Sequence, residues 1–186
     1  MPEEIINEIS KIQKHIFQRN FIVGSFTKKE NLHLTLKFLG EVPEDKVEEI
    51  KNNLSKIKFK KFKVHLGELG FFGDRIFWVE LLGDEIFKLQ KEVDDKLKNL
   101  FDAERSGLIQ RKVEPQGNLG SLRKEKRFMS HITIARIKKM RKVPEKELEN
   151  VKYSKGECEV TGFSLQKSVL TSEGAKYERL FKVEPD

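Results

Sequence analysis

Two short segments of the chain share one pattern: residues 31–40 read NLHLTLKFLG, and residues 131–134 read HITI. In each segment a histidine is followed two positions later by a threonine, and apolar residues alternate with them. The chain has four histidines and only five threonines, so two such matches would rarely arise by chance. Side chains two positions apart on a β-strand share a face. The pattern therefore predicts two strands that each present an imidazole and a hydroxyl on one face and apolar side chains on the other.

The sequence that follows each motif is also repeated. VPEDKVEEI at 42–50 follows the first motif, and VPEKELENV at 143–151 follows the second. Both segments place proline and acidic residues where a helix begins. A motif followed by a helix, found twice, indicates a duplicated unit. We expect the two motif strands to lie close together about a pseudo-twofold axis.

The rest of the chain alternates between helical and extended periodicity. Helices are expected at 2–17, 43–57 and 84–101, the last with Phe87 facing inward, and strands at 21–26, 31–40, 59–69, 75–82, 128–138, 157–170 and 175–183. Helices mixed with hairpins indicate the α+β class. The prediction is a single two-lobed α+β domain over residues 1–186, in which antiparallel sheets line a central cleft and helices lie outside.

Composition excludes several classes of protein. The single cysteine, Cys158, excludes an intramolecular disulfide scaffold, and no CxxC or His–Cys cluster suggests structural zinc. No apolar run approaches the length of a membrane span, and the N-terminus is acidic and unlike a secretory signal. These features predict a soluble, cytoplasmic protein with no membrane partner.

The positive charge is concentrated in one segment. The chain has a net charge of +7, yet residues 105–142 contain twelve Lys and Arg against two Glu, so this segment carries +10 and the remainder −3. Residues 102–127 show no clear period and contain Gly and Pro, which predicts a long basic loop. A basic segment on a mildly acidic body is typical of proteins that bind a polyanion, and we expect that partner to be RNA.

The paired motifs suggest a specific chemistry. Two histidines can act as general acid and general base near neutral pH, and hydroxyls can donate to phosphoryl oxygens. This set suits in-line displacement at a phosphodiester without a metal ion. Two weaker interpretations are that the motifs are exposed surface pairs or that they form a metal site. The metal site is disfavoured because no HxH or HxxxH accompanies the motifs. His15 and His65 are expected to be structural or surface residues, and Cys158 a small strand residue.

The segments ENLHLTLKFLG (30–40) and HITIAR (131–136) resemble the 2H phosphoesterase superfamily. Within it the chain looks like the RNA 2′,3′-cyclic phosphodiesterase family, also called 2′-5′ RNA ligases. Residues 165–170 and 173–178 resemble the C-terminal hairpin of that family, and the resemblance covers most of the chain except 102–127. Ser130 stands where the family commonly has proline. Family members also usually open with a short apolar strand before a helix start like Pro2-Glu3-Glu4.

The resemblance implies hydrolysis of RNA 2′,3′-cyclic phosphate ends to 2′-phosphomonoesters with no metal or other cofactor. By this resemblance His33 would be the proton donor to the leaving 3′ oxygen, and His131 the proton acceptor that activates water. Thr35 and Thr133 would hold the phosphoryl oxygens, and Arg136 would contact the substrate phosphate. The expected partner is RNA with such ends, tRNA included, and the chain is expected to act as a monomer.

The sequence is also compatible with two other functions. The same site could run in reverse and join RNA ends through a 2′-5′ linkage, because microscopic reversibility allows it. A non-catalytic RNA-binding protein could instead use the basic segment, although this function would not require both histidines.

Overall fold

The computed structural model describes residues 1–105, 128–141, 148–172 and 174–186. Its elements, in chain order, are α1 (Glu3–Arg19), β1 (Ile22–Phe26), the 3-10 turn η1 (Lys29–Asn31), α2 (Glu44–Leu54), β2 (Phe62–Phe72), β3 (Ile76–Leu82), α3 (Asp84–Arg105), β4 (His131–Met140), β5 (Glu157–Val160), β6 (Phe163–Thr171) and β7 (Gly174–Val183). Helices and antiparallel strands are mixed along the chain, so the predicted α+β class is confirmed.

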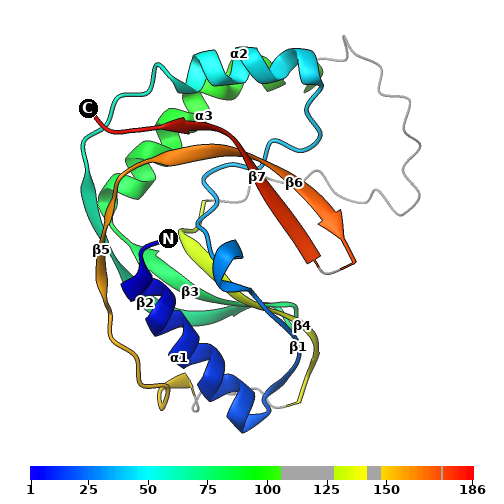
Figure 1. Ribbon diagram of the computed structural model, residues 1–186, viewed down its shortest axis with the longest axis vertical. Helices are drawn as coiled ribbons and strands as arrows, with labels where there is room; N and C mark the ends of the chain where they lie inside the picture. Colours follow the sequence, from blue (N-terminus) through cyan, green and yellow to red (C-terminus); the bar gives the residue numbers. More distant parts are fainter. Residues whose placement is uncertain (106–127, 142–147, 173) are drawn as a thin grey trace.

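The larger sheet has five antiparallel strands in the order β1-β4-β3-β2-β5. Helix α1 covers one face of this sheet (Figure 1), because its isoleucines recur every three or four residues and form a single apolar stripe. The stripe packs against strand residues such as Phe77 and Ile132, which are fully buried. The second motif lies on β4, which pairs with the edge strand β1 on one side and with β3 on the other.

The smaller sheet is the β6–β7 ribbon, and it packs on a second core. Phe163 and Leu165 of β6 and Phe181 and Val183 of β7 contact the apolar faces of α2 and α3. Figure 1 shows this ribbon between the two helices and the five-stranded sheet. Leu36, from the first motif segment, packs against both cores. The first motif therefore lies where the two cores meet.

The predicted strand over residues 31–40 is wrong in extent. Residues 29–31 form η1, and the segment after it makes one isolated antiparallel bridge, Leu34 to Ile132. Before η1, strand β1 pairs with β4, and Thr27, the residue after β1, donates its N–H to the Ile134 carbonyl at 2.8 Å. The chain then turns away from β4 through η1 and pairs with β4 again at Leu34. Because η1 interrupts the pairing, the segment pairs with β4 only at Leu34 and forms no continuous strand.

The third helix also differs from the prediction. It continues to Arg105, so residues 102–105 are helical and are not part of a loop. The rest of the predicted loop, 106–127, and the start of the predicted helix after the second motif, 142–147, lie outside the described residues. Ile86 is buried in place of Phe87, which is 47% exposed and rests edge-on against Phe128. The two apolar residues are adjacent, and only packing decides which one faces the core.

The predicted strand over residues 157–170 is divided in two. β5 pairs with β2 in the larger sheet, whereas β6 pairs with β7 in the smaller one. Gly162 lies between them with φ +154°, and a Cβ there would lie 2.8 Å from the carbonyl oxygen of Val183. This glycine lets the chain pass from one sheet to the other.

Cys158 lies buried on β5 opposite Val64. Burial raises the pKa of its thiol, which disfavours the reactive thiolate. Its placement agrees with the expectation of a small strand residue. No helix in the described part of the chain is long and apolar enough to span a membrane.

We predict that a residue larger than glycine at position 24 would disturb the pairing of β1 with β4. A Cβ at this position would lie 2.1 Å from the carbonyl oxygen of Arg136, which is a backbone atom and cannot swing away. We expect Gly24→Ala to lower the free energy of unfolding by about 1–3 kcal/mol, as overpacking does. Gly156→Ala is the matched control, because its Cβ would meet side-chain atoms only at 3.7 Å. Urea unfolding of both variants tests this, and equal stability of the two would contradict it.

Candidate active site

The bridge between Leu34 and Ile132 sets the geometry of the two motifs. It is antiparallel, so by register His33 lies opposite Thr133, and Thr35 lies opposite His131. Residues directly opposite each other in such a pair have Cβ atoms about 4.5–5.5 Å apart. Each histidine therefore neighbours the threonine of the other motif, and the two motifs form one cluster.

The side chains of the cluster share one face. Ile132 is fully buried and Leu34 packs against the same core, so the flanking residues point the other way. His33, Thr35, His131 and Thr133 are all half-buried, as expected for groups at the surface of a site. The structure thus brings together the four motif residues that the sequence singled out.

Both imidazoles are held in the same way. The Nδ1 atom of His33 lies 2.7 Å from the carbonyl oxygen of Asn31, and that of His131 lies 2.8 Å from the carbonyl oxygen of Met129. A carbonyl oxygen only accepts, so each bond requires a proton on Nδ1. In the neutral ring this leaves the Nε2 lone pair free, and Nε2 is the atom that can exchange protons with a ligand.

Ser130 fixes the start of β4, immediately before His131. It is 2% exposed, and its hydroxyl donates to the carbonyl oxygen of Leu81 at 2.6 Å. The Leu81 N–H in turn donates to the Ser130 carbonyl at 3.1 Å. Both bonds of Ser130 therefore anchor this end of β4 to β3.

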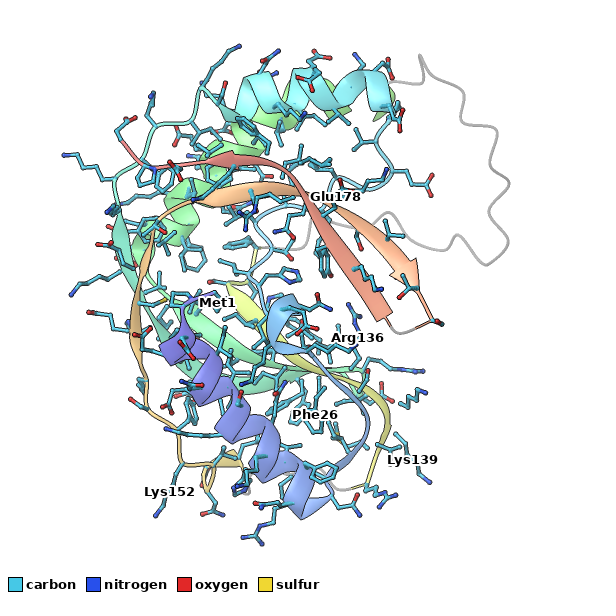
Figure 2. All side chains as sticks on the ribbon, viewed as in Figure 1. Met1, Phe26, Arg136, Lys139, Lys152 and Glu178 are labelled. Atoms are coloured by element: carbon cyan, nitrogen blue, oxygen red, sulfur yellow. The ribbon has the colours of Figure 1, made fainter. Side chains whose placement is uncertain are left out.

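A β-bulge brings Arg136 to the same face as the motif. Thr133 pairs with Trp78, whereas Ala135 pairs with Phe77, so Ile134 is an extra residue in β4. Without the bulge, a residue three positions after Thr133 would point to the opposite face. With it, Arg136 pairs with Ile76, two residues from Trp78, and joins Thr133 on the site face. Arg136 is exposed and lies next to the end of β1 (Figure 2).

A second bulge turns Tyr177 toward His33. In β7, Phe181 pairs with Leu165 but Arg179 pairs with Gln166, so Leu180 is the extra residue. Because of this bulge, Arg179 and Tyr177 face away from the side of β7 that Phe181 presents to the α2 and α3 core. The Tyr177 ring lies edge-on to His33 with centroids 4.9 Å apart. The Asn31 side chain ties the same region together by donating to the Ala175 carbonyl at 2.9 Å.

Aromatic rings also surround His131. The centroid of the Phe72 ring lies 4.8 Å from that of the imidazole at an interplanar angle of 89°, and the Trp78 centroid lies 6.4 Å away. Sequence reasoning did not single out Phe72, Trp78 or Tyr177 among the aromatic residues. The alternation of β2 and β3 would place Phe72 and Trp78 on one face, but only the pairing with β4 shows that His131 shares it.

The remaining histidines do not take part in the cluster. His15 is half-buried on α1, and His65 is exposed on β2, where it pairs with Glu157 of β5. Among the described residues, no group of three or more His, Cys, Asp or Glu side chains is arranged to hold a metal ion.

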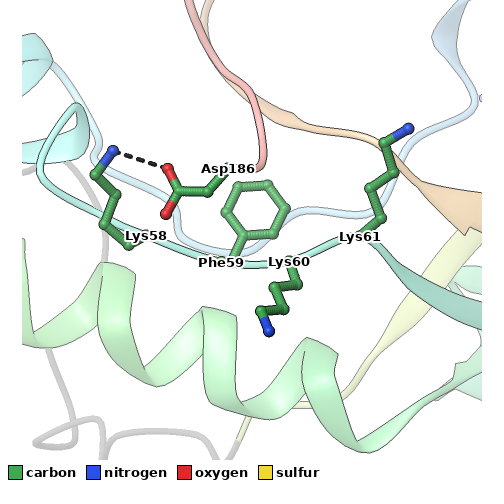
Figure 3. Close-up of a pocket in the computed structure, with 5 residues that line it drawn as sticks. All are labelled: Lys58, Phe59, Lys60, Lys61 and Asp186. Atoms are coloured by element: carbon green, nitrogen blue, oxygen red, sulfur yellow. Dashed lines mark hydrogen bonds and ion pairs between the residues drawn. The ribbon is translucent and has the colours of Figure 1, made fainter.

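Two surface hollows in the described part of the chain lie away from the motifs. One is lined by Lys58, Phe59, Lys60, Lys61 and Asp186, with an ion pair of 2.8 Å between Lys58 and Asp186 (Figure 3). The other lies between α1 and the segment 154–157. Neither contains a motif residue.

Comparison with known proteins identifies the family. The model of the family described as LigT-like phosphoesterases matches residues 1–78. An RNA 2′,3′-cyclic phosphodiesterase of Methanocaldococcus jannaschii is 31% identical over 96% of this chain and 92% of its own length. The chain belongs to the LigT-like phosphoesterase family. Another member of this family, an RNA 2′,3′-cyclic phosphodiesterase of Archaeoglobus fulgidus, is 35% identical over 81% of this chain and 78% of its own length.

Solved structures share the fold of this LigT-like phosphoesterase. A protein of Thermus thermophilus superimposes with a TM-score of 0.76 at 24% identity, over 99% of this chain and 93% of its own. E. coli LigT in its apo form gives a TM-score of 0.68 at 22% identity, over 100% of this chain and 92% of its own. The fold predicted from the motifs is thereby confirmed.

The hydrogen bonds at Nδ1 predict the tautomers of the two motif histidines. We expect both His33 and His131, when neutral, to carry their proton on Nδ1, because each faces a carbonyl oxygen there. Long-range ¹H–¹⁵N spectra of the imidazoles measure this directly, with exposed His65 as the internal reference. An Nε2-protonated neutral ring at either motif histidine would contradict the geometry.

Proposed function

We propose that the chain hydrolyses RNA 2′,3′-cyclic phosphate ends to 2′-phosphomonoesters, without a metal ion. The single observation that carries the proposal is the antiparallel register between Leu34 and Ile132, which sets the two histidines and two threonines on one face. Relatives from several organisms that match most of this chain bear the name RNA 2′,3′-cyclic phosphodiesterase.

In the proposed mechanism, His131 is the general base. Its free Nε2 takes a proton from water as the water oxygen attacks phosphorus. His33 enters as the imidazolium, in which Nδ1–H donates to the Asn31 carbonyl and Nε2–H points at the substrate. As the bond between phosphorus and the 3′ oxygen breaks, that oxygen takes the Nε2 proton of His33. The two rings end with exchanged protonation states, and proton exchange with solvent resets them.

The remaining polar groups of the face stabilise the transition state. Thr35 and Thr133 donate hydrogen bonds to the non-bridging phosphoryl oxygens, where negative charge accumulates. Arg136 shares this face because of the bulge at Ile134, and its guanidinium suits a phosphate oxygen. The exposed cations Lys138, Lys139 and Arg141 continue along and beyond the strand, and we assign them to the RNA backbone.

Replacing either motif histidine is expected to abolish most of the activity. His33→Ala and His131→Ala should each lower kcat by about 10²–10⁴-fold, the usual contribution of a general acid or base. The assay is a short RNA with a 2′,3′-cyclic phosphate, incubated in EDTA, with product identified as the 2′-phosphate. His65→Ala is the matched control and should retain wild-type activity, because His65 lies on β2 outside the cluster.

The same assay separates the competing functions. An intact cyclic end after incubation with the wild-type protein would overturn the hydrolase and favour RNA binding alone. Wild-type hydrolysis that EDTA abolishes would instead indicate a metal site. A motif variant with the rate of the wild type would remove that histidine from the mechanism.

Arg136 is expected to contribute to substrate binding. We expect Arg136→Ala to raise KM by about tenfold, equivalent to one charge-assisted hydrogen bond, and to weaken its dependence on salt. Lys152→Ala is the control, because Lys152 is also exposed but lies apart from Arg136, at the lower left of the view in Figure 2. Steady-state kinetics at two salt concentrations measure both, and an equal change in the two variants would contradict the assignment.

A further inference from the structure

An aromatic cluster borders one side of His131. On β2, Gly70 pairs with Trp78 of β3, and Phe72 pairs with Ile76, so Gly70, Phe72 and Trp78 lie on one face. Trp78 in turn pairs with Thr133 of β4, which places the cluster on the site face of the sheet. The neighbouring Phe71 points the other way and stacks on Phe77 in the core, with centroids 4.9 Å apart.

The three rings contact one another in geometries that aromatic groups favour. Phe72 meets the imidazole of His131 almost perpendicularly at 4.8 Å, and Trp78 meets it at 6.4 Å and 63°. Phe72 and Trp78 lie 5.3 Å apart. The two pairs with His131 are edge-to-face, an arrangement that is attractive at these separations and favours one relative orientation of the rings.

Gly70 makes room for this arrangement. A Cβ at Gly70 would lie 2.3 Å from Cζ2 and 2.5 Å from Cη2 of the Trp78 indole. The indole thus lies directly on the backbone of β2. Its Nε1 is buried and has no hydrogen-bond partner in the described part of the chain, so among these residues the ring is held by packing.

His131 needs such support because its own hydrogen bond leaves it a degree of freedom. The bond from Nδ1 to the Met129 carbonyl fixes one atom of the ring, but the ring can still tilt about that contact. A general base must aim Nε2 at the attacking water, and small errors in such aim reduce rates strongly. The perpendicular Phe72 ring, supported by Trp78, restricts that tilt.

We propose that Phe72 and Trp78 are positioning residues that fix the plane of the His131 imidazole, and that Gly70 is glycine because the Trp78 indole occupies the place of a Cβ. The inference rests on the proposed function for the role of His131 as the general base. Phe72 and Trp78 act through His131 and take no proton themselves.

The test compares two adjacent phenylalanines. Phe72→Leu removes a ring from the site face, Phe71→Leu removes one from the core face, and Gly70→Ala displaces the indole by a different route. For Phe72→Leu and Gly70→Ala we expect a fall in kcat of about tenfold with KM within about twofold. We also expect changed residual dipolar couplings of the imidazole C–H bonds of His131, which report the orientation of the ring and not the lost ring current, with those of His33 unchanged. Phe72→Tyr, which keeps the ring, should restore both readouts.

The control and the contrary results separate this inference from the proposed function. Phe71→Leu should lower Tm but leave kcat and the His131 couplings unchanged. His131 couplings that do not change in Phe72→Leu overturn the inference, and so does a raised KM with unchanged kcat, which would make Phe72 a substrate contact. The dipolar couplings need no turnover and report the ring orientation itself, so they decide the positioning role even if the protein proves unable to hydrolyse the cyclic phosphate.

Discussion

The pairing of Leu34 with Ile132 fixes the relative position of two segments that are 98 residues apart in the chain. One antiparallel bridge between their apolar residues aligns His33 with Thr133 and Thr35 with His131. Because the two apolar side chains pack on the core, the four polar ones share the opposite face. The same constraint makes the site locally twofold, with each imidazole held at Nδ1 by the carbonyl oxygen two residues before it.

The rest of the structure supports this junction from both sides. The five-stranded sheet holds β4 between β1 and β3, and Ser130 anchors its start. The β6–β7 ribbon rests on α2 and α3 and turns Tyr177 onto His33. The bulges at Ile134 in β4 and at Leu180 in β7 each change the face on which the following or preceding residues lie. Each of these strands therefore places some side chains in a core and others on the face of the site. Leu36 packs on both cores and thereby couples the two halves beside the first motif.

Much of this arrangement could be predicted from the sequence, and the exceptions have physical reasons. The His-x-Thr pairs, their apolar partners and the three helices follow from periodicity, which depends on residues close in the chain. The bulges at Ile134 and Leu180 could not be predicted, since a bulge is defined by what the neighbouring strand pairs with. The neighbours of His131, Phe72 and Trp78, were missed for the same reason. Residues 31–40 have the alternation of a strand, yet η1 interrupts the pairing that would have made them one.

The register itself can be measured most directly by cross-linking. In a Cys158→Ala background, Thr35→Cys combined with His131→Cys should form an intramolecular disulfide rapidly under mild oxidation, because directly opposite residues approach the geometry that a disulfide requires. The diagonal pair, Thr35→Cys combined with Thr133→Cys, should oxidise far more slowly, since diagonal neighbours are about 7–8 Å apart. Thiol titration and mass spectrometry quantify both rates. Faster oxidation of the directly opposite pair supports a single site shared by the two motifs. Equal rates, or faster oxidation of the diagonal pair, would contradict the register on which the site and its chemistry depend.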